Sequence, residues 1–172
     1  MPLVYRPEID WINPDYSPVF TERQKKLQLI RDTPGMLEGM KDFYKTNPSQ
    51  FITDWCCTFD PRLIERGIEA TVPFLLFDKQ AEYVDWIVSR WQGREDGVVE
   101  KSRDAGVSWL CVGIAVWMWL YYPGVVVGFG SRKEEYVDKL GDPKSLFWKV
   151  RALINLLPKE FRPKGYSEKA HA

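Results

Sequence analysis

The chain has few of the residues from which disulfide frameworks and metal sites are built. It contains three cysteines and one histidine, His171, among its 172 residues. Cys56 and Cys57 are adjacent, which gives no Cys-x-x-Cys ligand spacing, and Cys111 lies in an apolar stretch. We therefore expect no disulfide scaffold, no Cys/His metal site and no Cys–His nucleophile. A reducing, cytoplasmic compartment suits this cysteine usage.

The chain also lacks an excess of charge of either sign. Lys plus Arg and Asp plus Glu number 24 each, so the composition gives no support for a broadly basic, nucleic-acid-binding surface. Residues 1–8 contain no basic stretch followed by an apolar core, and we expect no signal peptide. A hydrophobic content of 45% with eight tryptophans indicates a packed globular protein.

Charged side chains are absent from residues 105–131, a stretch longer than the roughly 20 residues that cross a bilayer. However, Pro123 and Gly124 divide it. The part expected to be helical, residues 108–121, would be ~21 Å long, which is shorter than a hydrocarbon core of ~30 Å. Residues 125–129 are mostly β-branched and favour a buried strand. A membrane-associated protein is therefore the least favoured alternative.

The first seventy residues predict an extended arm followed by helices. Residues 1–20 carry four prolines and no periodicity, which indicates an arm. Residues 21–31 begin with a capping box and predict a helix. Further helices are expected after a capping residue and a proline at residues 33–34, 47–48 and 60–61. Residues 21–70 are thus expected to form an all-helical segment without a catalytic constellation.

Residues 71–172 alternate between helix and strand patterns. We expect a helix at 78–92, a strand at 97–100, a helix at 108–121 and a strand at 125–129. Helices from 131 to 140 and from 142 onward follow. This order predicts the opening of a doubly wound, parallel α/β sheet. Open sheets of this kind usually have about five or six strands, so we expect a partner chain or, as the favoured interpretation, a longer chain of which this is the front part.

The turn between the first of these strands and its helix has the spacing of a phosphate-binding loop. Gly106 and Ser108 occupy the last-glycine and Ser/Thr positions of GxxxxGK[ST]. Val107 stands at the lysine position, and Lys101 stands at the first-glycine position. A displaced lysine can still reach the phosphates because it is a point charge on a flexible stem, and a helix N-terminus attracts anions. The pattern alone also fits an exposed, charged turn that caps a buried helix.

Three separated segments resemble the large subunit of tailed-phage terminases. They are residues 77–80 before a helix that ends in tryptophan, residues 100–109, and residues 127–133, with further similarity through 138–148. They occur in the family's order, and the resemblance covers about residues 73–171. It implies the front of a RecA-like P-loop ATPase domain that drives double-stranded viral DNA into the procapsid, with ATP and Mg²⁺ as cofactors. It also implies the portal protein, the small terminase subunit and a homo-oligomeric ring as partners, in the cytoplasm of a bacterial host.

The resemblance assigns roles to individual residues. Lys101 is expected at the β/γ-phosphates, Arg103 at the γ-phosphate or as a sensor of hydrolysis, and the Ser108 hydroxyl at Mg²⁺. Gln80 matches a glutamine near the adenine. The expected nucleotide-binding set is Gln80, Lys101, Ser102, Arg103, Asp104, Ala105, Gly106, Val107, Ser108 and Trp109. Arg132 and Lys133 are expected to couple the nucleotide state to DNA.

For several of these residues a purely structural interpretation stays open. Gln80 also fits a solvated residue in the first turn of a helix. Arg103 also fits a surface salt bridge with Asp104, and Arg132 and Lys133 fit the solvated start of a helix.

The chain departs from the family where catalysis would be completed. No apolar strand followed by Asp-Glu occurs after residue 130, and the acidic cluster of a two-metal nuclease is absent. We therefore expect a motor ATPase fragment, cut before its Walker B strand, that binds nucleotide without completing hydrolysis alone. The alternative function is a non-enzymatic interaction module of a phage packaging complex.

Overall fold

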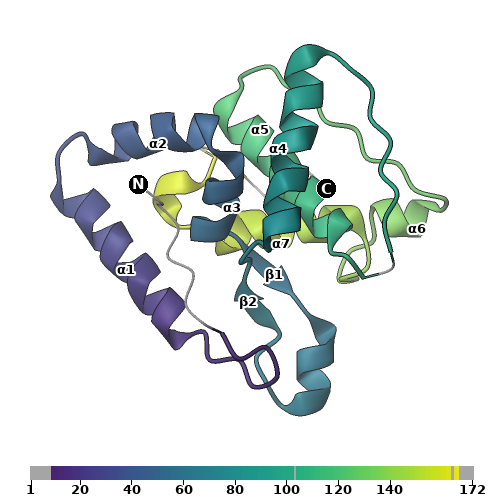
Figure 1. The fold of residues 1–172 in the computed structure, drawn as a ribbon, viewed down its shortest axis with the longest axis horizontal. Coiled ribbons are helices and arrows are strands. Elements are labelled where there is room, and N and C mark those ends of the chain that lie inside the picture. The colour runs from purple at the N-terminus through teal and green to yellow at the C-terminus, as the bar shows by residue number, and fades with distance from the viewer. Residues whose placement is uncertain (1–8, 103, 164, 167–172) are drawn as a thin grey trace. The chain divides into compact units, whose positions relative to one another are not determined.

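The computed structural model describes residues 9–102, 104–163 and 165–166. The chain divides into two compact units, which we call unit 1 (Met1–Leu75) and unit 2 (Leu76–Ala172). Figure 1 shows their helices and strands, with unit 1 running from purple to blue and unit 2 from teal to yellow.

Unit 1 combines helices with a small sheet. Its elements are α1 (Ser17–Asp32), α2 (Met36–Thr46), α3 (Pro48–Trp55), β1 (Cys57–Phe59), the 3₁₀ helix η1 (Pro61–Arg66) and β2 (Thr71–Pro73). The strands β1 and β2 are antiparallel, with Thr58 opposite Val72. The prediction that residues 21–70 are all helical is therefore wrong. Each strand is only three residues long, which is too short to display the alternating pattern that identifies a strand in a sequence.

The first two helices begin at other residues than predicted. Helix α1 begins at Ser17, inside the stretch expected to be an extended arm. Thr21 does not cap it, since its hydroxyl donates to the Ser17 carbonyl at 2.9 Å within the helix. Helix α2 begins after Gly35, whose φ of 79° places it in the left-handed region, a conformation that glycine adopts without steric cost. The asparagine and proline at residues 47–48 do open α3, as predicted.

A buried carboxylate ties the helices of unit 1 together. Asp54 of α3 is 9% exposed. It accepts hydrogen bonds from the Tyr44 hydroxyl at 2.8 Å, the Gln50 amide at 2.8 Å and the Lys26 ammonium at 3.0 Å. These donors come from α2, α3 and α1 respectively. A buried charge needs such partners to offset its lost hydration, so this network fixes how the three helices pack.

Unit 2 is built around one apolar helix. Its elements are α4 (Asp78–Gly93), α5 (Val107–Tyr121), α6 (Glu134–Val137), α7 (Leu146–Leu156) and the 3₁₀ helix η2 (Lys159–Phe161). Helix α5 contacts both α4 and α7, and its residues 112–117 are all buried. A helix that is apolar on every side belongs in a core. Among the described residues, no helix combines the length and apolar character that a membrane span requires.

The two strands predicted at residues 97–100 and 125–129 are not formed, and the prediction is wrong on this point. Both segments are irregular, and Figure 1 draws them as coil. No backbone hydrogen bond joins one to the other in the part of the chain that the structure describes. Val98 and Val126 are each 94% exposed. A strand exists only when a neighbour pairs with its N–H and C=O groups, and neither segment has that neighbour among the described residues.

At the level of fold class, the described residues form a mixed helical structure with one small antiparallel sheet. The parallel, RecA-like sheet is not present among them and stays a prediction. Aromatic contacts nevertheless hold the two irregular segments. A Cβ on Gly97 would lie 2.6 Å from the Trp86 ring of α4, and Phe129 packs edge-on against Phe147 of α7 with 5.9 Å between ring centroids.

The last helices are shorter than predicted. Lys133, rather than Ser131, precedes α6, which spans only four residues. Helix α7 begins after Ser145, whose side-chain oxygen accepts from the Trp148 N–H at 3.4 Å, and not at the proline of residues 142–143. Residues 140–141 and 143–144, which include the proline, form turns instead.

Candidate functional site

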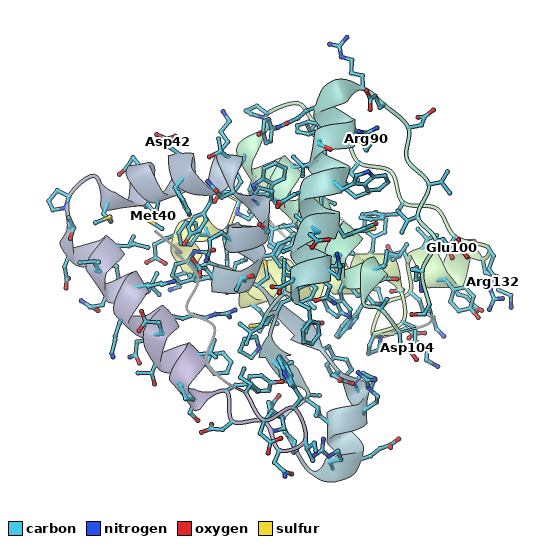
Figure 2. The ribbon with its side chains drawn as sticks, in the orientation of Figure 1. Met40, Asp42, Arg90, Glu100, Asp104 and Arg132 are labelled. Atoms are coloured by element: carbon cyan, nitrogen blue, oxygen red, sulfur yellow. The ribbon has the colours of Figure 1, made fainter. Side chains whose placement is uncertain are left out.

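The candidate phosphate loop lies between the C-terminus of α4 and the N-terminus of α5. Residues 95–102 run as exposed, irregular chain. The loop then turns at two left-handed residues, Asp104 with φ 63° and Gly106 with φ 76°, and α5 begins at Val107. A non-glycine residue in the left-handed region is uncommon, so the turn at 104–106 has a specific shape. In Figure 2 the labelled Asp104 lies at the lower right of unit 2.

The N-terminus of α5 has no side-chain cap. The Gly106 carbonyl accepts from the N–H groups of Trp109 at 2.9 Å and Leu110 at 3.1 Å, which starts the helix. The first N–H groups of a helix have no partner inside it, and together with the macrodipole they attract anions. The exposed Asp104 carboxylate works against this attraction, because it places a negative charge on the same loop.

Gln80 connects the start of α4 to this loop. Its side-chain oxygen accepts from the Phe77 N–H at 3.1 Å, and its Nε2 donates to the Ala105 carbonyl at 3.3 Å. A Cβ on Gly106 would lie 3.0 Å from the same Nε2. The structure thus brings together Gln80, Ala105 and Gly106 from segments that are 25 residues apart. Because the Gln80 side chain bonds to two backbone groups, it is not simply a solvated residue of the first helical turn.

The first half of the predicted loop is less constrained. Lys101 and Ser102 are exposed and lie in irregular chain, and no ion pair of Lys101 occurs among the described residues. Arg103, predicted to sense the γ-phosphate, lies outside the described residues. The structure does not bring Lys101 into a described hydrogen bond with the turn at Gly106. Its role at the phosphates stays a prediction.

The second half of the loop is anchored to the core. Val107 is partly buried and Ser108 is exposed at the start of α5. Trp109 packs edge-on against Trp148 of α7, with 6.5 Å between ring centroids. The Lys149 ammonium lies 5.9 Å from the Trp109 ring, which is within the range of a cation–π contact. The start of α5 is therefore held at two points, by Gln80 at Ala105 and by Trp148 of α7 at Trp109.

Lys149 is a residue that sequence reasoning missed. It is 8% exposed, and its ammonium donates to the carbonyls of Pro143 at 2.6 Å, Lys144 at 2.9 Å and Ser145 at 3.2 Å. Burial lowers the pKa of this ammonium. All three of its donors are engaged, so Lys149 stabilises the turn before α7. No sequence signal marks it, because a lysine beside apolar helix positions resembles a solvent-facing residue.

A second buried cation also supports this region. Arg151 of α7 is 5% exposed and forms an ion pair with Asp138. Asp138 follows α6 directly. Together with Lys149, this pair holds residues 138–145 against α7.

Arg132 and Lys133, predicted to couple nucleotide state to DNA, lie together just before α6. Both side chains are exposed. The Arg132 guanidinium lies 5.2 Å from the Tyr136 ring, and the Lys133 ammonium lies 3.5 Å from a Glu135 carboxylate oxygen. In Figure 2 Arg132 is at the outer edge of unit 2. The pairing with Glu135 agrees with a solvated helix start, and the DNA role stays a prediction.

The oxygen donors at Ser108 bear on whether the residues fit Mg²⁺. No group of three or more His, Cys, Asp or Glu side chains that would bind a metal occurs within the described ranges. The exposed Ser108 hydroxyl offers one oxygen. Mg²⁺ is usually bound by one or two protein groups together with phosphate oxygens and water. The residues therefore fit Mg²⁺ only when phosphate oxygens and water supply the remaining ligands.

Comparisons with known proteins do not extend this description. No protein-family model, no curated protein sequence and no solved structure matches the chain.

Proposed function

We propose that unit 2 binds the phosphates of ATP, with Mg²⁺, at residues 101–108, as the nucleotide-binding part of a motor that moves double-stranded viral DNA. The observation that carries this proposal is the turn at residues 104–106. Its two left-handed residues lead into the uncapped N-terminus of a buried helix. Turns of this kind direct N–H groups outward and bind phosphate in many proteins.

Two residue roles belong to the same proposal. Lys101 supplies the cation for the β/γ-phosphates, and Ser108 supplies the hydroxyl for Mg²⁺. Lys101 is exposed and belongs to no described ion pair, so its ammonium is available to an anion. The motor function, the RecA-like sheet and the packaging partners rest on the resemblance to terminase large subunits. Because the chain has no Walker B carboxylates, we expect binding without turnover.

Lys101→Ala tests the proposal. A lost charge-assisted contact is worth roughly 1.5–3 kcal/mol, so we expect at least a tenfold loss of ATP affinity by titration calorimetry in the presence of Mg²⁺. Val107→Ala should bind like the wild type. A phosphate loop that takes its lysine from position 101 does not use the side chain at position 107. Lys144→Ala, which removes an exposed lysine of the same unit, is the control for net charge. Equal ATP affinity in the wild type and Lys101→Ala would refute the assignment.

A non-enzymatic interaction module is the second candidate, and one observation favours it. The irregular segments 97–100 and 125–129 expose β-branched side chains, with Val98 and Val126 each 94% exposed. Extended, unpaired chain of this type can add to a partner's sheet edge. This candidate predicts no ATP-dependent shift in the thermal unfolding midpoint of the wild type. A clear shift with ATP and Mg²⁺, absent in Lys101→Ala, would exclude a module that acts without binding nucleotide.

A further inference from the structure

Both ends of the Gln80 side-chain amide are used. Its oxygen faces the Phe77 N–H, which can only donate, and its Nε2 faces the Ala105 carbonyl, which can only accept. The partners therefore fix the orientation of the amide. One bond belongs to the start of α4, and the other lies on the candidate phosphate loop.

The bond to Ala105 orients the next N–H group of the loop. In a planar trans peptide the C=O and the following N–H point in opposite directions. Holding the Ala105 carbonyl toward Gln80 therefore turns the Gly106 N–H away from Gln80. Gly106 precedes the first residue of α5, where N–H groups that face outward contact an anion.

The glycine at position 106 permits this arrangement. Its φ is 76°, and a Cβ there would lie 3.0 Å from Gln80 Nε2. A contact this short requires the neighbouring atom to move. Glycine thus allows both the left-handed turn and the approach of the Gln80 amide.

From these contacts we infer that Gln80 is a positioning residue: it holds the Ala105–Gly106 peptide so that the Gly106 N–H faces the phosphates. This inference rests on the proposed function. It differs from the role that the resemblance implies, because the Gln80 amide contacts loop backbone. A residue that only caps α4 would need the bond to Phe77 alone.

Two variants separate capping from positioning. Gln80→Glu keeps an oxygen for the Phe77 N–H and removes the donor to Ala105. Gln80→Met has similar length and removes both bonds. Gln92→Met is the control, because Gln92 is exposed on the same helix. The added charge of Gln80→Glu is checked at about 0.5 M salt, where exposed charges are strongly screened.

The first measurement uses the nucleotide-free full chain and NMR relaxation. We expect the Gly106 amide to be rigid in the wild type and Gln92→Met, with an order parameter of about 0.85, and to fall below about 0.6 in both Gln80 variants. The Phe77 N–H should keep its protection from hydrogen exchange in Gln80→Glu and lose it in Gln80→Met. An unchanged order parameter of Gly106 in both variants overturns the inference.

The second measurement is the affinity for ATP with Mg²⁺. Both Gln80 variants should bind at least tenfold more weakly than Gln92→Met, and the loss in Gln80→Glu should persist at high salt. If Gly106 becomes mobile and ATP affinity does not change, the positioning role is overturned while the proposed function stands. If the wild type does not bind ATP, the proposed function fails, and the positioning role toward phosphates fails with it.

Discussion

Gly106→Ala is expected to destabilise unit 2 more than a change of any exposed turn glycine. Alanine in the left-handed region costs about 1–2 kcal/mol. In addition, its Cβ would lie 3.0 Å from Gln80 Nε2. If Gln80 moves aside, it gives up the hydrogen bond to Ala105, which is worth about 0.5–1.5 kcal/mol. The total is about 1.5–3.5 kcal/mol.

Two other glycines of unit 2 separate these contributions. Gly124 has φ 83° and open space around its Cβ position, so Gly124→Ala should show only the backbone cost of about 1–2 kcal/mol. Gly130 also has open space and no left-handed φ. Gly130→Ala should therefore change stability by no more than about 0.5 kcal/mol.

Urea unfolding followed by tryptophan fluorescence measures the three variants, because Trp117 of α5 is fully buried. The midpoint concentration should fall in the order Gly130→Ala, Gly124→Ala, Gly106→Ala at a constant m value. Combining Gly106→Ala with Gln80→Ala should recover about 1 kcal/mol relative to additivity, because the clash is then absent. A Gly106→Ala variant that is no less stable than Gly124→Ala contradicts the contact with Gln80.

Three further predictions concern unit 1 and the cysteines. Tyr44→Phe removes one donor from the buried carboxylate of α3 and should lower the free energy of unfolding by about 1–3 kcal/mol in urea titrations. Hydrogen bonds from the Arg62 side chain hold the pKa of Asp60 below its ordinary value. The ionised Asp60 therefore stabilises the fold above its ordinary pKa, and this contribution is lost as the pH falls through the lowered pKa. An NMR titration of Arg62→Ala should give a higher pKa for Asp60. Burial raises the pKa of Cys56, so iodoacetamide should modify Cys111, which is partly exposed, before Cys56; the opposite order in mass spectra would refute this.

The helices flanking the site could be predicted because their signals are local. The apolar stripe of residues 78–92 and the apolar run of residues 108–121 match α4 (Asp78–Gly93) and α5 (Val107–Tyr121) within one residue at each end. Periodicity and the neighbouring glycine reside in the same stretch of sequence as the helix. Strands are different, because their hydrogen bonds come from another segment. Residues 97–100 and 125–129 have β-branched composition without a described partner, which is why composition alone misled the prediction.

The site shows the same division between local and distant information. Gly106 could be identified from its spacing in the loop, and its left-handed φ of 76° is a local property. The contact from Gln80 to Ala105 joins residues 25 positions apart, so no pattern in the sequence indicates it. Lys149 was missed for a different reason: its partners are carbonyls only four to six positions away, but a lysine beside apolar helix positions resembles a solvent-facing residue.

The two halves of the loop are held by different means, and this difference bears on the affinity for phosphate. Residues 104–109 are fixed by a hydrogen bond from α4 and by the packing of Trp109 against α7, so their N–H groups need little reorganisation. Lys101 lies in exposed chain that no strand ladder holds among the described residues, and fixing the backbone of one residue costs roughly 1–2 kcal/mol. Binding must offset that cost. Any partner strand that pairs with residues 97–100 removes part of it in advance, and should therefore strengthen ATP binding without touching the nucleotide.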